Sequence, residues 1–440
     1  MHRSAAEQSK HERRSSQMTE EHCVILAVDK TESENDMPTL PLSDIKVLDF
    51  MWAIAGPGST RMLADYGATV VRVESSHRFD ATRTVGPFIK GKPGAENSGL
   101  FFNMNVGKRM LTLDLSKQEA RSVVLDLVRW ADVVTESFSP KAMRAWGFDY
   151  ESLRKIKPDI IMLSTCLMGQ TGPMAQYAGF GNLAAAIAGF TNIAGWSDRP
   201  PAGPFGAYTD YIAPWFNAAA ILAALEYRAR TGQGQHIDLS QAEASLQFLS
   251  PALLDAAVNG RVQQRMGNRD INYAPHGVYP TAGADRWIAI VVTNDEQWNS
   301  LCSVMARPDL ATAPHFAMLT ARLTHQDELD ELLSAWTKDK DSFQLEQELQ
   351  AHGVPATAVR SMGEMYSDPQ LQHRGHFVQL THPKYETTTV EGSRFRLSRT
   401  PANITGSAAT IGRDNQYVLE ALLGYSEERI TELVAAGALE

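Results

Sequence analysis

The 440-residue chain is long enough for two or three domains, and its composition, 43% hydrophobic and 21% charged, is that of an ordinary soluble globular protein. A formal net charge of −10 argues against broad binding to nucleic acid or to an anionic membrane surface. It does not exclude a local basic groove that binds a phosphorylated cofactor. The three cysteines, Cys23, Cys166 and Cys302, are too few and too scattered for a disulfide framework or a zinc site. There is no apolar run long enough to span a bilayer and no apolar segment typical of a signal peptide, so we expect a cytoplasmic protein without a membrane partner.

The first part of the chain alternates between predicted strands and helices. Residues 1–40 are polar and charged, apart from the run CVILAV, and we expect a largely disordered tail there. The alternation that follows is typical of βαβ units and predicts a mostly parallel sheet. Strands are expected at 45–50, 69–75, 110–115, 131–137 and 159–166, and helices over AGPGSTRMLADYGA and at 117–130, 140–155 and 215–230.

The character of the sequence changes beyond about residue 265. A strand at 286–292, a helix over DEQWNSLCSVM and a charged amphipathic helix at about 325–350 indicate a second, smaller domain. After residue 370 we expect loops, short strands in HFVQLTH and RFRLSRTP, and a terminal helical stretch. There is no cluster of His, Asp or Glu with the spacing of metal ligands, so a metal is not indicated.

One segment has the glycine spacing of a nucleotide-binding turn. Gly179, Gly181 and Ala184 reproduce the spacing G-x-G-x-x-A, and Asp198 follows at roughly the distance of a ribose-binding acid. In dinucleotide-binding folds, however, a strand leads directly into this turn. Here the preceding strand is expected to end at Cys166, and about a dozen loop residues intervene. We therefore interpret the small residues as permitting close helix packing.

Asp210 is the most suggestive single residue, because it stands in an otherwise uncharged run of aromatic and small residues from 200 to 225. Neighbours such as Tyr208 and Trp215 would remove water from its carboxylate, which makes a carboxylate a better nucleophile or raises its pKa. The alternative is that Thr209 or Asp210 caps the helix that follows. The residues alone do not decide between these interpretations.

Several sequence motifs follow one another along the chain in the order in which a known enzyme family has them. Among them are LSDIKVLDFMWAIAGPGSTRMLADYGATVVRVE, FFNMNVGKRMLTLDL, GQTGP and ILAALEYRARTGQGQHIDLSQAEA. With them, residues 41 to about 430 resemble the family III CoA-transferases, which include formyl-CoA:oxalate and carnitine CoA-transferases. The resemblance implies an α/β fold with a large Rossmann-like domain built from both chain ends, at 41–245 and 366–440, and a smaller α/β domain at 246–365. It also implies an interlocked homodimer.

The resemblance implies an enzyme that moves coenzyme A from an acyl-CoA donor to a carboxylic acid, for which a dicarboxylate such as succinate is a natural participant. CoA would act as a substrate, and no tightly bound cofactor is expected. The catalytic aspartate of the family falls on Asp210. Its carboxylate would attack the acyl-CoA thioester to form a mixed anhydride, which the CoA thiolate then converts into an aspartyl-CoA thioester.

The chain departs from its relatives around this aspartate. Many of them carry a glutamine in the first strand–helix turn, where this chain has Ile54. Some also carry a glutamate at the position of Gly181, where the α-methylacyl-CoA racemases have a histidine. Neither Gly181 nor the adjacent Asn182 can act as the second base, which favours acyl transfer over racemisation. An acyl-CoA racemase or isomerase, and a non-catalytic acyl-CoA-binding protein, remain alternatives.

The phosphates of CoA require cations, and Lys108 with Arg109, just before a strand, are the preferred candidates. In the substrate pocket we expect Ile54, Gly181, Asn182, Tyr208 and Arg269. Arg269 either binds the carboxylate of the acceptor or pairs with Asp270. The full set of candidate CoA-binding residues is Arg72, Arg83, Asn105, Lys108, Arg109 and Arg144.

Overall fold

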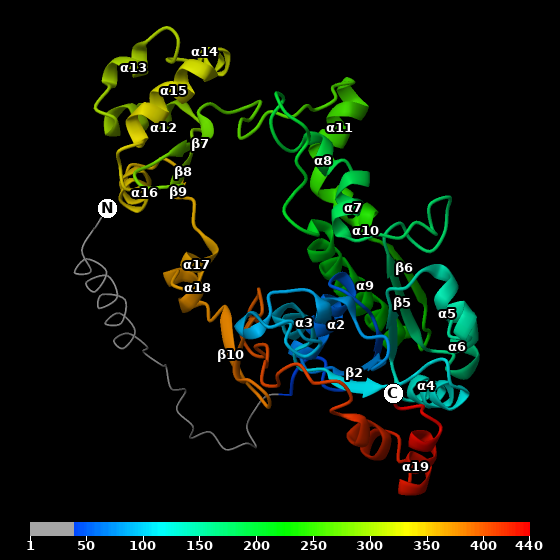
Figure 1. Cartoon of the computed structure of the whole chain (residues 1–440). Coiled ribbons are helices and arrows are strands. Elements are labelled where there is room, and N and C mark those ends of the chain that lie inside the picture. The colour runs from blue at the N-terminus through cyan, green and yellow to red at the C-terminus, as the bar shows by residue number, and fades with distance from the viewer. Residues whose placement is uncertain (1–38) are drawn as a thin grey trace, which may run out of the picture. The chain divides into compact units, whose positions relative to one another are not determined.

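The computed structural model describes residues 39–440, so the predicted tail, with CVILAV and Cys23, lies outside the described residues. The main sheet has six strands in the order β3-β2-β1-β4-β5-β6, and every neighbouring pair is parallel. The predicted parallel sheet is therefore confirmed. Its strands are β1 (Lys46–Phe50), β2 (Thr69–Glu74), β3 (Arg109–Thr112), β4 (Val133–Glu136), β5 (Ile161–Cys166) and β6 (His236–Ser240). Figure 1 labels β2, β5 and β6 of this sheet.

Both faces of the central strands β1, β4 and β5 are covered, so these strands are buried along almost their whole length, whereas the outer strand β6 is mostly exposed or half-buried. Successive side chains of a strand point to opposite faces. Val47 of β1 packs with Leu63 of α2 (Ala55–Asp65) and Ile221 of α9 (Tyr208–Thr231). Leu48 of the same strand belongs to the core on the other face, with α4 (Gln118–Trp130) and α19 (Glu427–Ala435). The C-terminal helix thus completes the large α/β layer, as the family resemblance implied.

The connections of the sheet change direction between β1 and β4. The chain runs from β1 outward to β2 and β3, and then returns to β4 on the other side of β1. Ligands of open α/β sheets bind at such a switch point, outside the carboxyl ends of the strands. The two loops concerned are joined here, because the backbone N–H of Trp52 donates to Ser137 Oγ at 2.8 Å.

A smaller antiparallel sheet has a core of its own. It consists of β7 (His276–Pro280), β8 (Trp287–Val291) and β9 (Ala356–Ala358). Buried side chains such as Trp298 and Leu333 connect it to the surrounding helices. This second core fits the expected smaller α/β part, while the domain boundaries at 246 and 365 stay a prediction. Its helices are α12 (Asp295–Val304), α13 (Pro308–Thr312), α14 (Leu319–Thr324), α15 (Gln326–Thr337) and α16 (Ser342–Ala351).

Two predicted helices are each divided into a pair. The segment 140–155 forms α5 (Pro140–Trp146) and α6 (Tyr150–Ile156), because Gly147 adopts the left-handed conformation and the Asp149 side chain caps the second helix. The segment 325–350 likewise breaks between α15 and α16, where Asp341 caps the latter.

The strand predicted in RFRLSRTP is wrong. Phe395 of that segment stacks on Tyr66 with ring centroids 4.9 Å apart, and its carbonyl accepts from the Tyr66 hydroxyl, so the segment lies against a side chain instead of joining a sheet. The strand pair in this region is β10 (Phe377–His382) with β11 (Glu386–Glu391).

In residues 39–440 no helix is long and apolar enough to cross a membrane. Within the same residues there is no group of three or more His, Cys, Asp or Glu that could bind a metal ion. The remaining helices are short: they are η1 (Ala81–Thr84), η2 (Ile89–Gly91), α3 (Gly99–Asn105), α7 (Gly181–Ile187), α8 (Phe190–Ile193), α10 (Gln241–Leu246), η3 (Gln247–Leu249), α11 (Ser250–Asn259), α17 (Met362–Met365), α18 (Pro369–His373) and the π-helical η4 (Tyr417–Leu422).

Candidate active site

Asp210 lies in the first turn of α9, and only 4% of the residue is exposed. The helix begins at Tyr208, well before the predicted start at 215, and its N-cap residue is Ala207. Neither Thr209 nor Asp210 is therefore the N-cap, and the capping alternative is not realised. A carboxylate in the first turn still benefits from the positive end of the helix dipole, which favours its ionised form.

The contacts of the carboxylate come from two further helices. The side-chain amide of Gln241, the first residue of α10, donates to Asp210 Oδ1. The backbone of Gly181, the first residue of α7, lies close to the same carboxylate. Burial raises the pKa of Asp210 above its ordinary value, and the Gln241 amide and the Gly181 backbone act in the opposite direction. The result is a poorly hydrated carboxylate in a fixed orientation, which is a suitable nucleophile.

Gly181 is required by the close approach of α7 to α9. A β-carbon at this position would lie 2.7 Å from the backbone nitrogen of Asp210 and 2.8 Å from its Cγ. Real β-carbons do not approach other atoms so closely, so a side chain at 181 requires Asp210 to move. The interpretation of the G-x-G-x-x-A spacing as close helix packing agrees with this geometry, and β5 indeed ends at Cys166, far before the turn.

Asp210 and Gln241 line a cavity of about 280 Å³ at the carboxyl end of the sheet. Its walls come from the loops after β1, β4 and β5, which is the switch point described above. Thr165 contributes a buried hydroxyl that has no hydrogen-bond partner within residues 39–440. The complete lining is Trp52, Ala53, Ala55, Ser137, Phe138, Ser139, Thr165, Cys166, Leu167, Ala175, Tyr177, Ala178, Gly179, Phe180, Asp210 and Gln241.

Among these lining residues, Asp210 is the only carboxylate, and there is no histidine or lysine. Cys166 is the competing nucleophile, but burial raises the pKa of its thiol to about 11, so the thiol stays protonated at neutral pH. The described part of this cavity therefore provides one reactive carboxylate and no second base.

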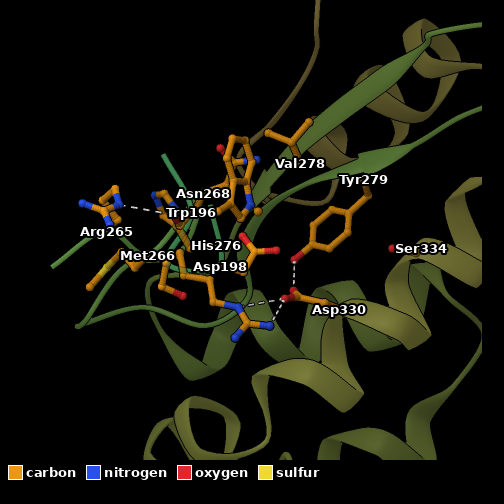
Figure 2. A pocket seen from close by; sticks show the side chains of 13 residues that line it. Trp196, Asp198, Arg265, Met266, Asn268, His276, Val278, Tyr279, Asp330 and Ser334 are labelled. Atoms are coloured by element: carbon orange, nitrogen blue, oxygen red, sulfur yellow. Dashed lines mark hydrogen bonds and ion pairs between the residues drawn. The ribbon is translucent and has the colours of Figure 1, made fainter. Parts of the chain in front are cut away.

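A second cavity, of about 470 Å³, lies between the loop that contains Trp196 and the smaller sheet (Figure 2). Arg269 lines it, and its guanidinium pairs with Asp330 at 2.7 Å and with Asp327 at 2.6 Å. Figure 2 shows the Tyr279 hydroxyl pointing at the same Asp330, to which it donates at 3.0 Å. The alternative partner Asp270 instead accepts from the backbone of Asn272. Although this cavity is larger, Asp210 does not line it.

Three of the predicted CoA-binding residues form a buried network beneath the β1–α2 loop. Arg72 pairs with Asp80 and donates to Asn105 Oδ1 at 2.8 Å, and the Lys108 ammonium donates to the same Asn105 oxygen at 3.0 Å and to Asp49 at 3.1 Å. Burial opposes ionisation of Asp49, but Lys108 and Arg72 lower its pKa.

This network supports the cavity wall from below. Asp80 accepts from the backbone N–H of Ala53, a cavity residue in the left-handed conformation, and Asp49 accepts from that of Met51. The structure thus places these cations where they fix a loop of the site.

Arg83 is likewise buried, and its Nε and Nη2 donate to the two carboxylate oxygens of Glu74 at 2.8 and 2.9 Å. Arg144 on α5 is exposed, and Arg109 is half-exposed beside Asp414, with its guanidinium over the ring of Tyr417. Ile54, Asn182 and Tyr208 are close to the site in sequence but do not line the 280 Å³ cavity.

Sequence reasoning missed several residues of the cavity, above all Gln241, Ser137 and Trp52. Each of them follows a strand of the main sheet within two residues. The rule that ligands bind beyond the carboxyl ends of parallel strands could have found Trp52 and Ser137 from the predicted strands at 45–50 and 131–137. Gln241 was out of its reach, because no strand was predicted at His236–Ser240.

Comparison with known proteins gives a consistent result. The sequence profile of the family described as CoA-transferase family III matches residues 42–415. A succinyl-CoA–D-citramalate CoA-transferase of Chloroflexus aurantiacus is 34% identical, over 90% of this chain and 98% of that protein. A succinate–glutarate CoA-transferase of Agrobacterium fabrum is 34% identical, over 88% of this chain and 97% of that protein. The crystal structure of a CaiB/BaiF family protein from Brucella suis superimposes with a TM-score of 0.80 at 31% identity, over 88% of this chain and 100% of that chain.

Proposed function

The chain belongs to CoA-transferase family III and is an enzyme of that type, and from this premise we propose that it moves CoA from an acyl-CoA donor to a dicarboxylic acid with Asp210 as covalent nucleophile. The observation that carries the proposal is the buried carboxylate of Asp210, held by the Gln241 amide in a cavity at the switch point. Because the thioester is cleaved by a carboxylate and not by water, the reaction requires the shielded position that burial gives to Asp210.

The proposed reaction has two symmetrical halves. The Asp210 carboxylate attacks the thioester carbonyl of the donor, the C–S bond breaks, and CoA thiolate leaves behind a mixed anhydride. The thiolate then attacks the aspartyl carbonyl, which releases the donor acid as its carboxylate and leaves an aspartyl-CoA thioester. The acceptor carboxylate reverses these two steps and departs as its CoA ester. No net proton is taken up, so a single carboxylate without a second base is sufficient.

The acceptor class is inferred from relatives and from the cavity. The names of the two relatives above refer to succinate, glutarate and citramalate, which are all dicarboxylates. Hydroxyl groups of Thr165, Ser139 and Tyr177 line the cavity and can donate to a distal carboxylate, and that of Thr165 has no partner within residues 39–440. We expect kcat/KM for succinate or glutarate to exceed that for butyrate by about tenfold or more.

We propose the exposed Arg144 and the half-exposed Arg109 as ligands of the CoA phosphates, because Arg72, Arg83 and Lys108 are engaged with buried carboxylates. CoA is then a substrate that binds and leaves in each cycle. Replacing Arg144 or Arg109 by Ala should raise KM for the acyl-CoA and change kcat little.

The decisive experiment is intact-protein mass spectrometry after incubation with succinyl-CoA. We expect wild-type protein to gain the mass of CoA less one water, and Asp210→Ala to gain nothing and to lose CoA transfer. Asp339→Ala, which removes an exposed aspartate, is the matched control and should behave as wild type. Full transfer activity in Asp210→Ala refutes the proposal.

The same samples separate the two alternatives. A racemase or isomerase would exchange the α-proton of an acyl-CoA with deuterated solvent without releasing free acid. A non-catalytic binding protein would bind CoA without turnover of any donor. The absence of a second base among the described cavity residues favours transfer over the first of these alternatives.

We further propose a cytoplasmic homodimer of the interlocked type. Large apolar side chains stay exposed along α9, among them Tyr211, Trp215 and Leu222, and on α11, among them Leu254 and Val258. Such extended apolar surface is typical of an interface. Native mass spectrometry should give a dimer, and a monomer at micromolar concentration would contradict this.

A further inference from the structure

Gln241 is in direct contact with the proposed nucleophile and is itself 94% buried, with an exposed fraction of 6%. The orientation of its amide is fixed by its partners. An ionised carboxylate only accepts hydrogen bonds, so Nε2 must face Asp210 Oδ1. The Thr209 hydroxyl donates to the carbonyl of Gly181 at 2.9 Å and therefore accepts from the same Nε2 at 3.1 Å.

The position of Gln241 is also fixed by the backbone. It follows β6 directly, and the next residue, Ala242, donates its N–H to the carbonyl of Leu167 at 3.0 Å. The Ser240 side chain caps α10 by accepting from Glu243. The amide is therefore presented to Asp210 from a strand–helix junction held by backbone and capping hydrogen bonds, as electrostatic preorganisation requires.

This amide comes from an unexpected element. The β1–α2 turn has Ile54, and Ile54 does not line the cavity. An amide nevertheless reaches the aspartate, from the start of α10.

On the basis of the proposed function, we propose that Gln241 is a catalytic residue of this chain: it holds Asp210 Oδ1 so that Oδ2 attacks the thioester, and it then stabilises the negative charge that develops on Oδ1. In the first step, a bond forms between Oδ2 and the acyl carbon, the C–S bond breaks, and Oδ1 becomes the carbonyl oxygen of the aspartyl anhydride. In the second step, CoA thiolate adds to the aspartyl Cγ, and the electron pair of the carbonyl moves onto Oδ1. When the donor carboxylate leaves with Oδ2, the carbonyl at Oδ1 forms again.

The proposal predicts which step depends on Gln241. The charge in the first step develops on the donor's carbonyl oxygen, whereas the charge in the second step develops on Oδ1, the atom that Gln241 contacts. Loss of one such donor lowers kcat by about 10²–10³-fold in other enzymes. We therefore expect Gln241→Leu, which keeps the size and removes the amide, to lower kcat by about a hundredfold while KM for the acyl-CoA changes less than about threefold.

The trapped intermediates provide a readout that a merely structural role would not change. Wild-type protein quenched during turnover of succinyl-CoA should carry mainly the CoA adduct on Asp210. Gln241→Leu should carry mainly the succinyl adduct, which hydroxylamine converts to the hydroxamate. The control is Gln247→Leu, which removes an exposed glutamine six residues further on and should match wild type in both rate and adduct.

A second variant tests the hydrogen bond itself. In Gln241→Glu, the introduced carboxyl shares one proton with Asp210, because two adjacent carboxylates do not both ionise readily. When it is protonated it can donate to Oδ1, so transfer should be weak at pH 8 and recover at pH 5–6 relative to Gln241→Leu. Equal activities of the two variants across this range overturn the role of the donor.

Failure of the inference and failure of the proposed function are distinguishable. If Asp210→Ala abolishes transfer but Gln241→Leu keeps kcat within about threefold of wild type, or accumulates the CoA adduct as wild type does, only the role of Gln241 is refuted. If Asp210→Ala retains transfer, the proposed function falls first. Circular dichroism and thermal unfolding of Gln241→Leu show whether the variant is folded, and the adduct ratio is measured on that folded protein.

Discussion

Adding a single methyl group at Gly181 should displace the nucleophile without removing any functional group. In Gly181→Ala the new β-carbon would lie 2.7 Å from Asp210 N and 2.8 Å from both Asp210 Cγ and Ala207 O. Ordinary contacts of this kind begin at 3.4 Å, so the two helices must separate by about 0.6 Å or more. A misplacement of about 1 Å can lower the rate by about 10²-fold. We expect kcat to fall by about ten- to a hundredfold, with a loss of about 1–3 kcal/mol in the free energy of unfolding from overpacking.

The measurement is CoA transfer from succinyl-CoA to glutarate, followed by chromatography of the CoA esters, together with urea denaturation. Gly363→Ala is the matched control, because its β-carbon would meet nothing within 4 Å. It should leave kcat unchanged and alter stability by less than about 0.5 kcal/mol. A wild-type kcat in Gly181→Ala would refute the argument that the approach of α7 positions Asp210.

Three further predictions concern buried ionisable groups. Lys108→Met leaves the buried Asp49 without its ammonium partner and should lower the free energy of unfolding in urea by about 3–5 kcal/mol at pH 7. The control is Lys141→Met, which removes an exposed lysine. A loss below about 1 kcal/mol for Lys108→Met would contradict the pairing. Burial raises the pKa of Glu136 to about 7 from 4.5, so its stabilising contribution is present below pH 4.5 and is lost as pH rises through 7. Glu136→Gln should remove about 3 kcal/mol of the difference in unfolding free energy between pH 5 and pH 8, and identical pH slopes for the two proteins would argue against it. Because the pKa of Cys166 is raised to about 11, iodoacetamide at pH 8 should alkylate it roughly a hundredfold more slowly than a peptide thiol, as peptide mapping would measure.

Five of the six strands of the main sheet were predictable because each contains a buried apolar run, such as DIIMLSTC, which includes β5. The sixth strand, β6, was missed, because its sequence HIDLS is mostly exposed or half-buried and has no apolar run. The helix breaks at Gly147 and before Asp341 were less visible, because apolar residues keep a helical spacing on both sides of each break. The early start of α9 was missed because Pro214 suggests a boundary, whereas the helix runs through it.

The sequence singled out Asp210 as a candidate but did not identify the residues around it. Asp210 stands out as a lone charge in an apolar run, and the family resemblance assigns it a role. Arg72 and Lys108, in contrast, read like any cations in the sequence. Their carboxylate partners Asp80 and Asp49 are brought to them by the sheet, and only the tertiary structure distinguishes a loop-fixing cation from one that faces a phosphate.

The position of β6 has a consequence for how activity depends on stability. In the described sheet β6 is an outer strand, paired on one side only, with β5, and it carries Gln241 at its end. Outer strands open with less free energy than the strands at the centre of a sheet. Opening of β6 would withdraw the amide from Asp210 while β1, β2 and β4 stay folded. We therefore expect the enzyme to lose activity on heating at a lower temperature than that at which the chain unfolds as a whole.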